Sequence, residues 1–140
     1  MSNFLDIEKA LISAYQAVGT LVPTGYPGAE LADAAIPDGL WAHVHNVRTE
    51  SKPVTLGGTG EDNHAGFLQI DLNYPRGKGS GELLVKADEL ITAFPAGRAL
   101  TYNGQEVKVS SSGLGPGRYV GGYYRVSIRI NYYARTTRNL

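Results

Sequence analysis

The sequence contains no cysteine and no long uninterrupted apolar stretch. Without cysteine, the chain cannot form a disulfide, bind zinc through thiolates or use a thiol nucleophile. No apolar segment reaches the roughly 20 residues that a membrane-spanning helix requires. The N-terminus lacks a positively charged segment followed by an apolar core, so no secretion signal is expected. These absences favour a chain that folds in a reducing cytoplasm and does not interact with a membrane.

The sequence also lacks an excess of charge of either sign, because 13 Lys and Arg residues balance 13 Asp and Glu residues. A neutral chain does not have the electrostatic character of a general nucleic-acid binder, and no sequence-specific nucleic-acid binding is expected. The charge is nevertheless uneven. The last part of the chain contains no acid but five arginines, Arg118, Arg125, Arg129, Arg135 and Arg138.

Glycine and tyrosine are abundant, with 18 and 9 residues among the 140. Such a composition favours strands, tight turns and surfaces that contact other proteins, because tyrosine offers a large contact area with few rotatable bonds. The chain length fits one domain, over residues 1–140. A chain of this size can bury an ordinary core without a metal or a disulfide.

Apolar spacing predicts two helices. The first extends from Asn3, as the N-cap, to a stop at Gly19, and its apolar stripe includes Phe4. The second covers residues 82–94, with Leu84 in its apolar stripe. Prolines and glycines predict an irregular segment over 20–39, with room for one short helical turn at 29–34.

Alternation of apolar and polar residues predicts strands over 40–48, 65–74 and 119–134, the last with a bulge or bend at Gly121-Gly122. Asn103-Gly104 predicts a tight hairpin between strands 99–102 and 106–110. Segment 49–63 is expected to be an exposed hairpin or a mobile loop. Segment 111–117 is expected to be a plain loop. The predicted fold class is α+β: a mostly antiparallel sheet with two helices packed on it.

Three histidines raise the question of a metal site. His43 and His45 share one face of a predicted strand, and His64 lies beside Glu61 and Asp62. These residues could form a three-His or His/carboxylate site. The preferred interpretation is a solvated polar strand face, because the third ligand would come only from a loop. No metal or cofactor is therefore expected.

Two glycine-rich runs, 77–81 and 113–117, do not match a phosphate-binding motif. A P-loop requires G-x-x-x-x-G-K-[ST], whereas Lys78 is followed by glycine and lacks the four-residue spacer. There is also no G-x-S-x-G nucleophile elbow and no spacing signature for paired carboxylates. The chain is not expected to be an enzyme.

The last strand points to a subunit interface. Arg125 and Arg129 project on the same face, and arginine is enriched at interfaces, where it pairs with carboxylates of a neighbouring subunit. A solvated sheet face is the alternative. The predicted interface residues are Arg125, Arg129, Asp71, Tyr123, Glu61 and Asp62.

The chain resembles tail-terminator-like proteins of long-tailed phages and prophages. The likeness lies in segments 66–75 (GFLQIDLNYP), 79–82 (GSGE), 87–90 (ADEL), 94–95 (FP) and 125–132 (RVSIRINY), together with the opening helix. The likeness covers most of the chain. None of these segments is a catalytic motif, so the likeness concerns the order and arrangement of the helices and strands.

The resemblance implies a sheet flanked by helices and a hexameric ring of identical copies. Such a ring caps the finished tail tube, ends tube polymerisation and offers a docking face to the head–neck connector. One ring face would meet the major tail tube protein and the other the neck, DNA would pass through the ring, and segments 20–39 and 49–63 would lie at the lumen or docking faces. The protein would be assembled in the bacterial cytoplasm and reside in the virion tail.

Two other functions remain open. A different head–tail joining, minor tail or head-completion protein would attach elsewhere or with another stoichiometry. A small metal-binding domain would use the three histidines.

Overall fold

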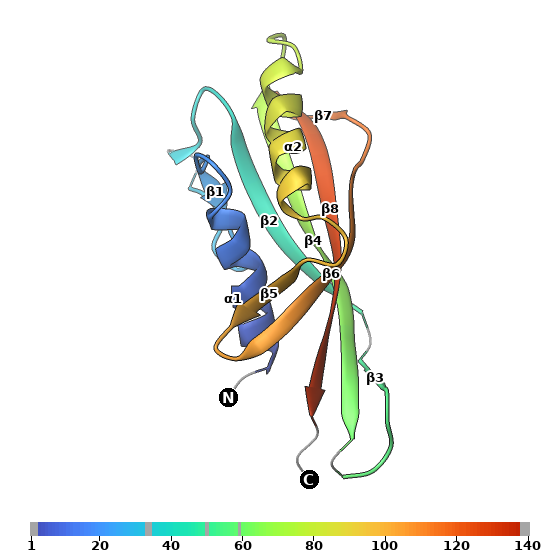
Figure 1. The fold of residues 1–140 in the computed structure, drawn as a ribbon. Coiled ribbons are helices and arrows are strands. Elements are labelled where there is room, and N and C mark those ends of the chain that lie inside the picture. Colours follow the sequence, from blue (N-terminus) through green and yellow to red (C-terminus); the bar gives the residue numbers. More distant parts are fainter. Residues whose placement is uncertain (1–2, 33–34, 50, 59, 138–140) are drawn as a thin grey trace.

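The computed structural model describes residues 3–32, 35–49, 51–58 and 60–137. Two helices lie on one side of a curled, eight-stranded mixed sheet (Figure 1). The elements are α1 (Asn3–Gln16), β1 (Thr24–Gly25), β2 (Trp41–Arg48), β3 (Lys52–Pro53), β4 (Glu61–Pro75), α2 (Gly81–Ala93), β5 (Ala99–Tyr102), β6 (Gln105–Leu114), β7 (Arg118–Val120) and β8 (Tyr123–Thr137). Neither described helix is long and apolar enough to span a bilayer.

The sheet is built around β4 and β8, which pair antiparallel over all 15 residues, from Glu61 opposite Thr137 to Pro75 opposite Tyr123. The strand order is β1-β2-β4-β8-β6-β5, with β3 paired to β4 and β7 paired to β8. Strict two-residue alternation then directs even-numbered residues of β4 and β8 to one face of the sheet and odd-numbered residues to the other.

The even-numbered face forms the core. The fully buried side chains at its centre are Leu68, Ile70, Leu72, Ile128 and Ile130. Helix α2 covers them with Leu83, Ala87 and Leu90, together with Phe94 directly after the helix, while α1 packs across β5 and β6. Each large aliphatic side chain buried in this way stabilises the fold by about 1.5–3 kcal/mol. This layer arrangement confirms the predicted α+β fold class.

The predicted helices are confirmed, with changes at their edges. Asn3 lies inside α1 and is not its N-cap, whereas Gly19, just beyond the helix, has the left-handed φ of 52° that suits a stop signal. Phe4 and Leu84 are 51% and 41% exposed and do not belong to the core, because each lies beside the buried stripe of its helix.

The segment before β2 was predicted without a strand, but Thr24 and Gly25 pair with β2 in parallel, which makes the sheet mixed. The predicted turn of helix at 29–34 is wrong for its described part, 29–32, because Ala29 forms a β-bridge with Tyr26; residues 33–34 lie outside the described ones. Segment 49–63 contains a hairpin in which β3 pairs with the start of β4.

The hairpin turn at Asn103-Gly104 is confirmed, with φ of 51° and 81°. The last strand does not bulge at Gly121-Gly122. The chain reverses there, with a φ of 58° at Gly121, and a separate β7 pairs back onto β8. Strand β6 runs to Leu114, so most of the predicted 111–117 loop belongs to the sheet.

Candidate functional site

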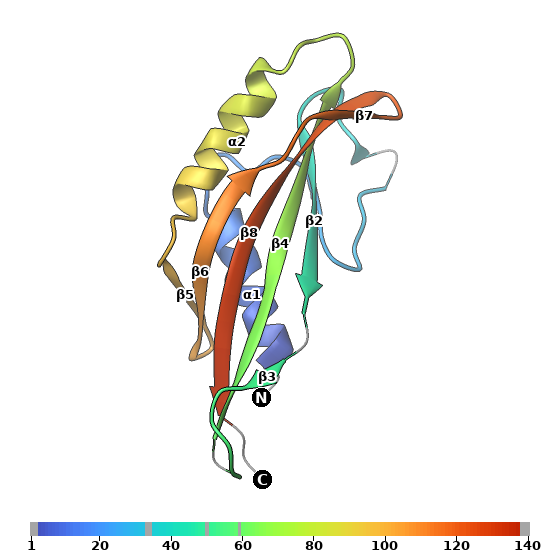
Figure 2. The ribbon, with the colours of Figure 1, turned by 90° about the vertical axis from the view of Figure 1, so that its right-hand side faces the viewer.

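No described helix covers the face of the sheet opposite α1 and α2. In Figure 2, β8, β4 and β2 face the viewer, and no helix of the described chain crosses in front of them. We call this surface the outer face. Its side chains come from β2, β4 and β8 and are Trp41, His43, His45, Phe67, Gln69, Asp71, Asn73, Arg125, Ser127, Arg129, Asn131 and Tyr133.

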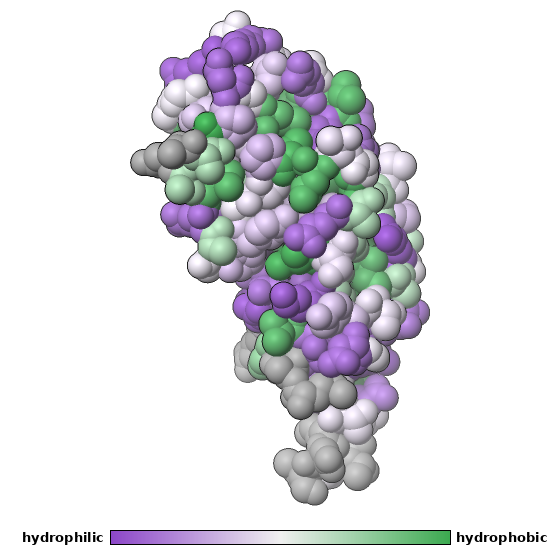
Figure 3. Space-filling view, turned by 90° about the vertical axis from the view of Figure 1, so that its left-hand side faces the viewer, coloured by the Kyte–Doolittle hydropathy of each residue, from purple (hydrophilic) through white to green (hydrophobic). Residues whose placement is uncertain are grey.

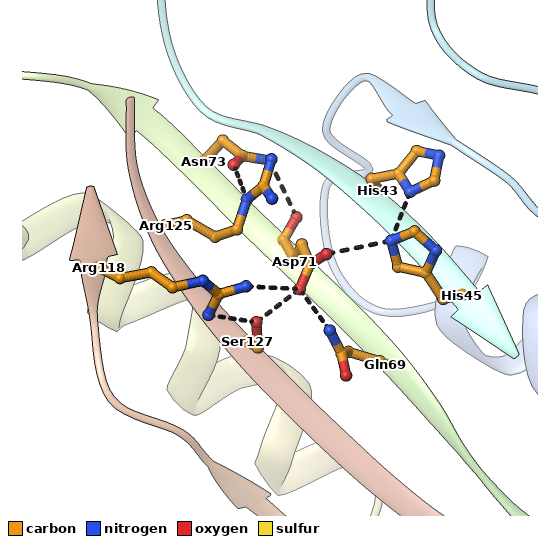
Figure 4. Close-up of polar contacts among 8 residues, drawn as sticks. All are labelled: His43, His45, Gln69, Asp71, Asn73, Arg118, Arg125 and Ser127. Carbon is orange, nitrogen blue, oxygen red and sulfur yellow. Dashed lines mark hydrogen bonds and ion pairs between the residues drawn. The ribbon is translucent and has the colours of Figure 1, made fainter. Parts of the chain in front are cut away.

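One end of the outer face is a buried polar network around Asp71, which is 3% exposed (Figure 4). The hydroxyl of Ser127 donates to Oδ1 of Asp71 at 2.5 Å, and Nε2 of Gln69 donates to the same atom at 3.0 Å. Nε2 of His45 lies 3.1 Å from Oδ2. Asp71 was predicted to meet a neighbouring subunit, but the structure places it among partners of its own chain.

The surroundings of Asp71 keep its carboxylate ionised. Burial raises the pKa of Asp71, but the hydrogen bonds from Ser127 and Gln69 and the positive charge of Arg125 favour the charged form, so the net effect is a pKa below the usual value. Arg118, from β7, adds a guanidinium nitrogen 3.9 Å from Oδ1.

His43 and His45 lie side by side, with Nδ1 of His43 2.8 Å from Nε2 of His45. Because Nε2 of His45 also faces the Asp71 carboxylate, that nitrogen carries a proton, and Nδ1 of His43 faces it as an acceptor. Burial, and then the neighbouring His45, lower the pKa of His43, which favours its neutral form. The other nitrogen of His43, Nε2, carries the proton in this tautomer. Together with Nε1 of Trp41, it is buried without a hydrogen-bond partner among the described residues.

His64 lies on the helix-bearing face, toward the other end of β4. Its ring bonds with the hydroxyls of Ser51 and Thr136, at 2.5 and 2.7 Å, and contacts Phe4 edge-on. It therefore cannot join His43 and His45 in one metal site. No group of three potential metal ligands occurs within the described parts of the chain.

Arg125 and Arg129 both project from the outer face, as the alternation predicted. Nε of Arg125 donates to Oδ1 of Asn73 at 2.7 Å, and the Arg129 guanidinium lies 4.5 Å from the centre of the Phe67 ring. Tyr123 packs edge-on against Trp41 at 5.4 Å. The side chain of Arg129 is exposed, whereas those of Arg125 and Tyr123 are half-buried.

Glu61 and Asp62 are not near this network. They lie ten and nine residues from Asp71 along β4, a distance of about 30 Å at 3.3 Å per residue. Asp62 also points to the opposite face of the sheet, because it pairs with the even-numbered Thr136. The six predicted residues therefore do not form one continuous patch on a single copy.

The middle of the outer face contains a groove that the sequence did not reveal. It has a volume of about 570 Å³ and lies beside β8 and β6. Its lining residues are Gln69, Ser111, Ser112, Gly113, Leu114, Gly115, Pro116, Arg118, Ser127, Arg129 and Asn131. The small residues of segment 111–117 were interpreted as a loop, yet they line a groove opposite the arginine-bearing strand.

A family model described as phage tail terminator protein matches residues 6–132. The chain belongs to this family. The resemblance inferred from the sequence is thus confirmed, and a tail terminator family member is a structural protein of the phage tail, not known as an enzyme.

The fold of this tail terminator family member also occurs among solved structures. One of them aligns with a TM-score of 0.66 and 17% sequence identity, over 91% of this chain and 87% of that chain. At this identity the likeness concerns the fold alone. Among curated proteins, none matches the chain.

Proposed function

We propose that this tail terminator family member forms a closed ring, a hexamer, that caps the phage tail tube and ends its polymerisation. The observation that carries the proposal is the outer face, where two long central strands present arginine and aromatic side chains that no described helix covers. Arginine and aromatic residues are the types enriched at protein interfaces. The ring and its size follow from the family resemblance.

The ring would have two different docking faces, one for the major tail tube protein and one for the head–neck connector, with DNA passing through the centre. In Figure 1 the hairpin formed by β3 and the start of β4 lies beyond the two helices, β5 and β6, beside the end of β8. We propose this hairpin and segment 20–39 as docking elements. Assembly would take place in the bacterial cytoplasm, and the finished ring would reside in the virion tail.

The test combines mass and imaging. Light scattering over a concentration series gives the absolute mass, and negative-stain images of the same sample show whether rings form. Adding the protein to growing tubes of the purified tail tube protein should stop elongation and leave a ring at one tube end.

Rings on tube ends, with shorter tubes at higher ring concentration, are the expected result. Tubes that elongate unchanged, with the protein bound only to DNA-filled heads, would contradict tube capping and favour a head-completion role. A protein that neither forms rings nor binds tubes would also contradict it.

A further inference from the structure

The surface of α2 that faces solvent is acidic with an apolar centre. It carries Glu82, Asp88 and Glu89 around Val85, which is 68% exposed, and Leu84. Figure 3, viewed from the helix-bearing side, shows apolar side chains gathered in the upper part of that side between hydrophilic ones.

The one lysine of α2 pairs with only one of these three acids, Glu89. Lys86 is only 8% exposed, and its ammonium group donates to the carbonyl of Thr20 at 2.8 Å and to Glu89 at 3.1 Å. Since Lys86 offsets the charge of Glu89 alone, Glu82 and Asp88 leave the outer side of α2 with more negative than positive charge.

The groove on the outer face has the complementary character. Its lining includes two arginines, Arg118 and Arg129, and no acidic side chain among the described residues. Both arginines are exposed. Arg118 lies 3.9 Å from Asp71, a carboxylate that other groups already satisfy, and Arg129 contacts the Phe67 ring. Both guanidinium groups therefore retain donors for an external carboxylate.

The floor of the groove carries small residues that leave space for an incoming helix. The residues of β6 opposite Asn131 and Arg129 are Ser111 and Gly113, and a Cβ added at Gly113 would meet nothing within 4 Å. A helix about 10 Å wide covers about two strands spaced about 4.8 Å apart. Pro116 borders the groove with apolar surface that an exposed valine and leucine can cover.

From this complementarity we infer that α2 of a second copy lies in the groove of the first. Val85 and Leu84 then cover the small residues of β6, and the acidic residues around them meet Arg118 and Arg129. Helix and groove lie on opposite faces of the same strands, so each copy uses two different patches. Such a head-to-tail contact repeats from copy to copy, and it closes into a ring when the rotation between copies fits. The inference rests on the proposed ring and specifies how its subunits meet.

Cysteine cross-linking tests the contact directly, since the chain has no cysteine of its own. The double variant Val85→Cys with Ser111→Cys should, on oxidation, give a ladder of disulfide-linked species that ends at the size of the ring. Each single variant can form at most a dimer. The pair Val85→Cys with Thr101→Cys, which moves the second cysteine to an exposed site on β5, is the matched control and should give no ladder.

Two further variants test the groove without disturbing the core. Gly113→Trp fills the groove at a position that has open space and no left-handed φ, so the subunit should unfold at the same urea concentration as the parent while its association weakens more than about tenfold. Arg129→Glu should weaken association similarly, and adding Asp88→Arg should restore it, because the charges are then exchanged across the contact.

The outcomes separate this contact from the ring itself. Rings that persist in folded Gly113→Trp and give no cross-linked ladder would overturn the α2–groove contact and leave the ring intact. A parent protein that forms rings neither in solution nor on tubes would overturn the proposed function. A ladder and a charge-exchange rescue support both.

Discussion

The two faces of the central sheet are built from alternate residues of the same strands, yet they differ in almost every property. Ile130 is fully buried beneath the helices, whereas Asn131, its neighbour, is exposed on the outer face. The helix-bearing face is a continuous apolar layer, and the outer face is mostly polar and is not covered by a described helix. The comparison shows that the apolar core and most of the polar side chains lie on opposite sides of one strand pair.

The outer face is itself divided. Around Asp71 and Asn73, which are 3% and 0% exposed, polar groups are buried and bonded within the chain. Around Arg129 the surface is open and its groups can bind a partner. A residue on the outer face is therefore not always able to contact a partner. The buried polar groups bond within the chain, and only the exposed ones are accessible to another molecule.

The largest difference in unfolding free energy between the two faces should appear when two neighbouring residues of β8, one on each face, are replaced by alanine. Ile130→Ala leaves a cavity in the core and should lower the free energy of unfolding by about 2–5 kcal/mol. Asn131→Ala removes one exposed hydrogen bond to Ser111 and should cost about 0.5 kcal/mol. Urea unfolding of both purified variants measures the two values. Equal costs would show that the outer face carries as much of the stability as the core.

A smaller loss is expected at the buried end of the outer face. Asp71→Ala removes the acceptor for Ser127 and Gln69 and should cost about 1–3 kcal/mol, because buried donors remain without a partner. Asp38→Ala is the control, since the side chain of Asp38 is 93% exposed and its cost should lie within about 0.5 kcal/mol. If both variants unfold like the parent, the polar network is not part of the fold's stability.

Acidification should weaken the same end in two steps. The pKa of His43 is lowered from 6.5, so the unfolded chain takes up the proton first, and stability falls as the pH drops below 6.5 toward the folded-state pKa. The pKa of Asp71 is lowered from 3.8, so its contribution is present above that pH and is lost as the pH falls through the folded-state value. Urea midpoints measured against pH follow both steps. His43→Gln should remove the upper step alone, and an unchanged profile in that variant would contradict the assignment.

The alternation of residues predicted which side chains share a face, because it depends only on the strand period. It correctly placed Leu68, Ile70 and Leu72 on one face and Arg125 and Arg129 on the same face as each other. It could not show that Asp71 is buried, because partners such as His45 and Arg118 come from other strands, β2 and β7.

Other features also lacked a local signal. β1 joins the sheet through two residues, Thr24 and Gly25, which are too few to show a period. The sequence predicted a bulge or bend within one strand at Gly121-Gly122, whereas the chain reverses there, because two glycines within an apolar alternation fit either outcome. The groove required the β6–β8 register, which sequence spacing does not specify.

The smallest effect is expected for an exposed polar contact on the helix-bearing side. Glu8 of α1 accepts from Arg48 at 3.0 Å and from Asn46 at 3.2 Å, and the side chains of Arg48 and Glu8 are 42% and 21% exposed. Glu8→Gln should cost about 0.2–1 kcal/mol, and less at high salt, because solvent screens an exposed ion pair. A double-mutant cycle with Arg48→Met, at low and high salt, isolates the pair. If the Glu8–Arg48 coupling energy were as large as the cost of Asp71→Ala, burial would not explain the difference in strength between the exposed ion pair and the polar network around Asp71. The difference between the buried and the exposed parts of the outer face would then need another cause.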